Sequence, residues 1–158
     1  MRQIFYSFHY DNDVMRVQQI RNIGSLDDNK PVSANQWEEV KMSGDSAIKK
    51  WIDDNMAYRS CVVVLIGSKT SERKWVKYEI EHAWKEGKAL LGIYIHNLKD
   101  PRSGVCSKGK DPFSNFVVNG VSMSKLVPCY DPISHDAYGD IRKNLESWVE
   151  DAIKNKKN

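Results

Sequence analysis

The chain has 158 residues, of which 41% are apolar and 28% charged, and its formal net charge is +3. A chain of this size can bury enough apolar surface for one domain, and the composition excludes a disordered or fibrous protein. No apolar run approaches the ~20 residues that span a membrane, and 24 basic residues against 21 acidic ones are too balanced to indicate a nucleic-acid partner. We therefore expect a single domain, 1–158, with no nucleic-acid or membrane partner. The lack of a signal-peptide pattern and of CxxC spacing favours a cytoplasmic location.

The chain begins with a predicted strand and helix. Residues 4–8 form an apolar run typical of a strand, and a polar cluster ends it. Asp11 or Asp13 can cap the helix that follows, because a carboxylate accepts hydrogen bonds from the free amides of a first helical turn. We expect this helix to end near Gly24.

The next part of the chain contains a weak segment, a helix and a strong strand. Residues 25–42 have no clear period, and we expect one short strand among them. Ser43 can cap a helix whose apolar stripe ends at Met56. The run Cys61–Ile66 is apolar and rich in β-branched residues, which is typical of a strand buried on both faces of a parallel sheet.

A third helix and another buried strand follow. Ser68 or Ser71 can open the helix, which we expect to end at about Gly87. Residues 89–95 form a second nearly continuous apolar run and predict the next strand of the same sheet.

The last third of the chain contains a long irregular segment, a strand and a helix. Residues 97–124 carry several glycines and prolines, and we expect Phe113 and Phe116 to attach this segment to the core, or a short helix to lie inside it. Residues 125–130 predict the last strand. Residues 141–153 carry the clearest helical stripe of the chain.

This alternation predicts an α/β fold with a doubly wound, mostly parallel sheet of about five strands and helices on both faces. Ligands of such sheets bind beyond the carboxyl ends of the strands, so the loops after Phe8, Ile66, Ile95 and Tyr130 are the expected place for a site. The chain has no GxGxxG, no GxxxxGK[ST] and no GxSxG. It therefore lacks a dinucleotide fingerprint, a phosphate loop and a serine-hydrolase elbow.

One carboxylate of the third helix differs from its neighbours. Glu81 has Lys77 four residues before it and Lys85 four residues after it, as a solvated surface glutamate does. Glu79 has no permanently charged basic residue within helical reach, and Trp75 lies one turn before it. An unpaired carboxylate of this kind is either an ordinary surface group or a functional one, and the spacing alone leaves both open.

His9 and Asp11 form a second candidate group. Both follow the first strand directly, at the edge of the sheet where ligands bind. The alternative is structural, with the aspartate as a helix cap and the histidine as a loop residue. Position favours a functional role, whereas the residue types alone favour neither.

Several segments together resemble a Toll/interleukin-1 receptor (TIR) domain. The matching segments are residues 4–8 (IFYSF), 44–48 (GDSAI), 60–68 (SCVVVLIGS), Ser71 and 75–80 (WVKYEI). The start Phe8-His9-Tyr10 and the loop at residues 109–113 look most like the ThsB proteins, the TIR-like subgroup of the Thoeris anti-phage system. The resemblance covers essentially the whole chain.

The resemblance implies an enzyme. In enzymatic TIR domains the glutamate of the Trp-x-x-x-Glu element is catalytic for cleavage of NAD+ between nicotinamide and ribose, and Glu79 occupies that position here. By the same resemblance the activity is that of an NAD+ nucleosidase or ADP-ribosyl cyclase, with NAD+ as substrate and no metal or other cofactor. The product would be a cyclic ADP-ribose isomer that activates a separate effector.

The resemblance also implies which residues meet the substrate. Phe8, His9, Tyr10 and Asp11 lie where TIR domains cover the nucleotide, and Phe8, Tyr10 or Trp75 can stack on a ring of the substrate. The alternative for Phe8 is a purely structural role as the last core residue of its strand. Ser46 could meet a phosphate through the exposed amides at its helix start, and Trp37 belongs to the mouth of the pocket. Implied partners are further copies of the chain on activation and a phage-derived trigger.

Two other functions remain open. Many TIR domains are not enzymes and act only by homotypic assembly, although the presence of both Trp75 and Glu79 disfavours this. A nucleoside deoxyribosyltransferase-like enzyme also cleaves N-glycosidic bonds with a glutamate on a related fold. Turnover of NAD+ or of deoxynucleosides would separate these possibilities.

Overall fold

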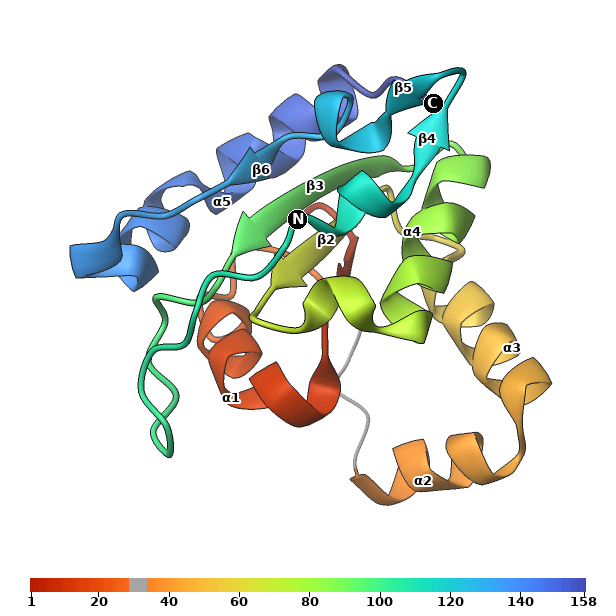
Figure 1. Cartoon of the computed structure of the whole chain (residues 1–158), viewed down its shortest axis with the longest axis horizontal. Helices are drawn as coiled ribbons and strands as arrows, with labels where there is room; N and C mark the ends of the chain where they lie inside the picture. Colours follow the sequence, from red (N-terminus) through yellow and green to blue (C-terminus); the bar gives the residue numbers. More distant parts are fainter. Residues whose placement is uncertain (29–33) are drawn as a thin grey trace.

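The computed structural model describes residues 1–28 and 34–158, and the side chains of 1–28 and 38–158. Its main sheet is parallel and has the order β1 (Ile4–Ser7), β2 (Cys61–Ile66), β3 (Ala89–Tyr94) and β6 (Cys129–Tyr130), as Figure 1 shows. Ser7 is in register with Val64, so β1 and β2 end close together at the carboxyl edge of the sheet.

Helices cover both faces of this sheet, which confirms the predicted fold class (Figure 1). Helices α1 (Tyr10–Arg21) and α5 (Ala137–Lys154) pack on one face, and α3 (Asp45–Met56) and α4 (Lys74–Lys85) pack on the other. Side chains of a strand alternate between the faces, and β2 is buried along its whole length, because each face is covered. Among the residues described, none of the helices has the length and apolar character needed to cross a membrane.

The sheet has four strands in the described part of the chain, where the sequence predicts about five. In residues 25–28 and 34–42 the expected strand is limited to one parallel bridge between Gln3 and Asp27, on the outer edge of β1, and residues 29–33 lie outside the described part of the chain. Further along, the helix α2 (Ala34–Met42) replaces it (Figure 1). That segment is rich in good helix formers but has no clean apolar stripe, which is why its periodicity gave no helical signal.

The predicted helix caps were wrong by a few residues. His9 caps α1 in place of Asp11 or Asp13, because its Nδ1 accepts a hydrogen bond from the Asn12 amide at 3.3 Å. Asp11 lies exposed in the first turn, where the helix dipole favours a negative charge.

The two helices on the other face also begin later than predicted. Gly44, not Ser43, is the N-cap of α3, and its φ of 92° is a left-handed conformation that favours glycine. The Ser43 hydroxyl instead donates to the carbonyl of Glu39. Neither Ser68 nor Ser71 caps α4: a short 3₁₀ helix, Thr70–Glu72, comes first, and Arg73 is the N-cap.

The long segment after β3 is attached to the core as predicted. Phe113 is fully buried and Phe116 packs against the same apolar cluster; a short 3₁₀ helix, Pro112–Asn115, contains Phe113 and ends directly before Phe116. Because a second 3₁₀ helix, Met123–Lys125, follows, β6 is shorter than the predicted residues 125–130.

The same segment contains an antiparallel hairpin that the sequence analysis did not predict. Its strands β4 (Val117–Val118) and β5 (Val121–Ser122) flank Asn119 and Gly120, which both have positive φ. An Asn-Gly pair between apolar residues is the usual sequence signal of a two-residue hairpin, so the signal was present.

A buried ion pair joins α1 to the loop after β3. Arg16 and Asp13 are 2% and 0% exposed, and Nη1 of the arginine lies 3.1 Å from Oδ1 of the carboxylate. The guanidinium also donates to the carbonyls of Leu98 and Gly104. The Asp13 carboxylate packs so closely on Gly67, just beyond β2, that any side chain at residue 67 would collide with it.

We predict that Arg16→Met strongly destabilises the protein, because it leaves the Asp13 carboxylate buried without a cation. The expected loss is about 3–5 kcal/mol in the free energy of unfolding, measured with urea. The matched control is Arg2→Met, which removes an exposed ion pair with Glu150 and should lose less than ~1 kcal/mol. Equal losses in the two variants would contradict this account of the pair.

Candidate active site

Glu79 lies at the carboxyl edge of the sheet with its side chain turned inward. It is on the buried face of α4 together with Val76 and Ile80, and it is only 8% exposed. The Ser7 hydroxyl donates a hydrogen bond of 2.7 Å to Glu79 Oε1. Because Ser7 is the last residue of β1, this bond places the carboxyl group at the edge where α/β sheets bind their ligands.

No cation from the described part of the chain offsets the burial of this carboxyl group. Among the described residues, Glu79 takes part in no ion pair, in agreement with the prediction from helical spacing. Burial raises its pKa from about 4.5 to about 8, and the hydrogen bond from Ser7 opposes this rise. The group is therefore mostly protonated at neutral pH and is poised to change charge when a ligand binds.

Of the predicted residues that follow β1, Phe8 packs against the apolar cluster of α1 and α5, on the face of the sheet opposite to the one that α4 and Glu79 cover. Phe8 and Tyr10 have ring centroids 6.2 Å apart, and the Arg21 guanidinium lies 5.6 Å from the Phe8 ring. His9 is buried, and its burial, reinforced by the positive charge of Arg73, lowers its pKa below 6.5. The histidine is therefore neutral at pH 7.

Trp75 is half-buried on the first turn of α4 and packs against the apolar cluster under α3. Its ring meets Tyr78 edge to face at 5.8 Å, and the Lys74 ammonium lies 4.8 Å from the ring. The Trp75 indole therefore contributes to packing between α4 and the core.

The remaining predicted site residues are not joined to this group. Ser46 is exposed in the first turn of α3, and no hydrogen bond connects it with Ser7 or Glu79 among the described residues. Trp37 is in α2, but its side chain lies outside the described residues.

Sequence reasoning missed Ser7 as a partner of the carboxylate. It was treated as an ordinary residue of the first strand. The sequence did contain a signal: Ser7 is a lone polar residue at the carboxyl end of a buried strand. When both faces of a sheet are covered, such a side chain needs a hydrogen-bond partner inside the protein.

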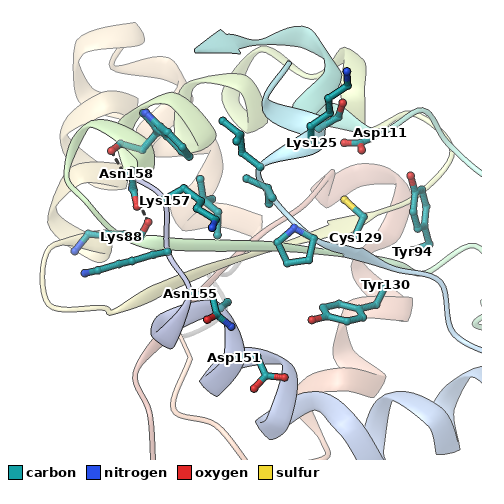
Figure 2. Close-up of a pocket in the computed structure, with 18 of the residues that line it drawn as sticks. Lys88, Tyr94, Asp111, Lys125, Cys129, Tyr130, Asp151, Asn155, Lys157 and Asn158 are labelled. Atoms are coloured by element: carbon teal, nitrogen blue, oxygen red, sulfur yellow. Dashed lines mark hydrogen bonds between the residues drawn. The ribbon is translucent and has the colours of Figure 1, made fainter. Parts of the chain in front are cut away.

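A cavity of about 750 Å³ lies elsewhere, between β3, β6 and the ends of α4 and α5. In Figure 2, Tyr94 and Cys129 lie at one end of it and Lys88 and Asn158 at the other. Burial raises the pKa of the Cys129 thiol, which makes the thiol a poor nucleophile. Glu79 does not line this cavity, so the cavity is not part of the site around the Glu79 carboxyl group.

The burial of Glu79 makes the stability of the protein depend on pH. Its pKa is higher in the folded protein than in the unfolded chain, so the folded state binds the proton more tightly. Stability from this group is fully present below pH ~4.5 and is lost as the pH rises towards 8, by up to about 1.4 kcal/mol per unit.

We predict that Glu79→Gln, which keeps an acceptor for Ser7, raises the melting temperature, and that its advantage over the parent grows from pH 5 to pH 8. Thermal denaturation at several pH values measures this difference. A glutamine variant less stable than the parent at pH 8 would contradict the assigned burial.

Two comparisons with known proteins identify the family of the chain. The family model described as "Thoeris protein ThsB, TIR-like domain" matches residues 5–100, a range that contains both Ser7 and Glu79. A relative from Bacillus cereus (strain MSX-D12), "Putative cyclic ADP-D-ribose synthase ThsB1", is 36% identical over 135 residues, which cover 82% of this chain and 70% of the relative. The resemblance predicted from the sequence is confirmed, and the chain belongs to the TIR-like ThsB family of the Thoeris system.

Proposed function

We propose that the protein is an NAD+-cleaving signalling enzyme of Thoeris anti-phage defence. It releases nicotinamide and forms a cyclic ADP-ribose-type signal that activates a separate effector. The observation that carries the proposal is the buried Glu79 carboxyl, which has no cationic partner in the described ranges 1–28 and 34–158 and is held by Ser7 at the carboxyl edge of the sheet. The name of the Bacillus cereus relative supports the class of product.

The chemistry follows from where charge develops in the reaction. The nicotinamide ring of NAD+ is cationic and leaves as a neutral molecule, so positive charge moves to the ribose. A fixed carboxylate beside the ribose stabilises that charge, and such preorganised electrostatic contributions are typically worth about 3–4 kcal/mol. A cation bound to Glu79 would cancel this effect, which explains why a carboxylate in this role has none.

The substrate itself supplies the positive charge that ionises Glu79. In the free protein the raised pKa, about 8, favours the neutral acid. The cationic nicotinamide ring of bound NAD+ favours the carboxylate, so binding releases a proton. The charge required for catalysis is thus created only when substrate is present.

Cyclisation completes the reaction without a protein nucleophile. The bond between the ribose anomeric carbon and the nicotinamide nitrogen breaks, and a hydroxyl of the same molecule attacks the anomeric carbon and loses its proton. Water attacking the same carbon would give ADP-ribose instead. Exclusion of water from the ribosyl cation therefore favours the cyclic product.

The predicted site residues provide the binding surface in this proposal. Phe8, Tyr10 and Trp75 offer rings for stacking, and His9 and Asp11 offer polar contacts to the nucleotide. Ser46 and Trp37 contribute at the phosphates and at the mouth of the site. The single domain, 1–158, needs no metal and no cofactor besides its substrate, and it assembles with further copies after a phage-derived trigger.

We predict that Glu79→Gln folds but reduces nicotinamide release from NAD+ by at least ~100-fold, because an amide cannot stabilise positive charge as a carboxylate does. The measurement is mass spectrometry of nicotinamide and cyclic products from phage-exposed cells that express the parent or the variant. The matched control is Glu81→Gln, an exposed glutamate of the same helix that pairs with Lys85.

Parent-like turnover by the Glu79 variant would overturn the mechanism. No nicotinamide release by the parent in triggered cells would favour a non-enzymatic module that acts by homotypic assembly. Cleavage of deoxynucleosides in place of NAD+ would identify a deoxyribosyltransferase-like enzyme.

A further inference from the structure

The two oxygens of the Glu79 carboxyl have different surroundings. Oε1 accepts the hydrogen bond from Ser7 Oγ at 2.7 Å. Among the described residues Oε2 has no hydrogen-bond partner. It is also absent from the set of fully buried side-chain atoms without a hydrogen bond, so it is not fully buried. The small exposed part of the side chain therefore includes Oε2.

The backbone of β1 determines the direction of the Ser7 hydroxyl. Ile4 and Tyr6 face the helices α1 and α5, and Phe5 faces α3 and α4. Because side chains alternate along a strand, Ser7 points to the same face as Phe5 and meets α4 there. Ser7 is 0% exposed, so its hydroxyl is shielded from bulk water. A buried hydroxyl needs a hydrogen-bond partner inside the protein, and Glu79 is that partner.

A hydroxyl suits this place better than a cation. It is uncharged, so it holds the carboxylate without cancelling the negative charge. It is also both a donor and an acceptor, so the pair persists when Glu79 is protonated and Oε1–H donates to Ser7 Oγ. An arginine or lysine would instead hold the group permanently ionised.

We propose that Ser7 is the positioning residue of the active site: its hydroxyl holds Oε1 of Glu79 and thereby aims Oε2 at the ribose of the substrate. This inference rests on the proposed NAD+-cleaving function. It assigns to Ser7 no contact with the substrate; its effect is transmitted through Glu79 alone.

Ser7→Ala is the primary test, with the pH dependence of NAD+ cleavage as the readout. Loss of a hydrogen bond to a charged group should lower kcat about 10–100-fold, with little change in KM. The midpoint of the rise of kcat/KM with pH, near 8 in the parent, should move upward by about one unit, because the ionised form loses its donor. Ser7→Thr, which retains the hydroxyl, should restore much of both values.

The control is Ser60→Ala at the amino end of β2, which removes a hydroxyl bond to the Gln3 carbonyl far from the carboxyl edge. It should leave kcat and the pH midpoint at parent values. Should the alanine variant of Ser7 fail to fold, Ser7→Cys replaces it: a thiol is a weaker donor of similar shape, and both effects should then be smaller but in the same direction.

A ¹³C NMR titration of the Glu79 carboxyl in the parent and the Ser7→Ala variant makes the test independent of turnover. An upward shift of the midpoint supports the positioning role. An unchanged midpoint together with an unchanged pH profile would overturn it while leaving the enzyme function intact. Full activity of Glu79→Gln would instead overturn the enzyme function, whatever the titration shows.

Discussion

Burial of one carboxyl group, which no cation of the described residues compensates, is the constraint on which the site depends. Burial of Glu79 against β1 removes water from its carboxyl group and so disfavours the ionised form. The hydrogen bond from Ser7 stabilises the ionised form, but it offsets only part of this effect on the pKa. As the pH rises towards 8, a protein loses stability through such an arrangement. Groups of this kind are characteristic of functional sites, where a shifted pKa is part of the chemistry.

The topology of the sheet explains why the group lies where it does. The chain leaves β1 and forms its bridge at Asp27 on one side of that strand, whereas β2 pairs on the other side. Among the described residues β1 is the edge strand of the sheet, and ligands of α/β sheets bind beyond the carboxyl ends of the strands. Ser7 ends β1 at this point, and α4 returns Glu79 to it.

The surroundings of this edge are held rigidly. The buried pair of Asp13 and Arg16 fastens α1 to the loop after β3, and Gly67 allows the Asp13 carboxylate to lie directly on the turn after β2. The side chain of Asn12 reaches Ser68, which joins the loops that follow the two strands. Preorganisation of this kind reduces the movement needed when charge develops on a substrate.

The fold was largely predictable because burial on both faces makes strands such as Cys61–Ile66 continuously apolar. Helix starts were less predictable, because several neighbouring polar residues can each occupy the N-cap position. In the folded protein His9 and Gly44 occupy it in α1 and α3. The absence of lysine or arginine within helical reach distinguished Glu79 from its neighbours, and the resemblance of Trp75-x-x-x-Glu79 to TIR domains implied its role; both are local properties of the sequence. Its partner Ser7 lies 72 positions away, and no local pattern connects them.

The central claim is that Glu79 is a buried acid that a cationic substrate ionises. A ¹³C titration of the Glu79 carboxyl in the parent protein, with and without a non-cleavable NAD+ analogue, tests it most directly. The account predicts a midpoint near pH 8 in the free protein and a fall of more than about one unit with the analogue bound. A midpoint near 4.5 in the free protein, or one that saturating analogue does not change, would contradict it.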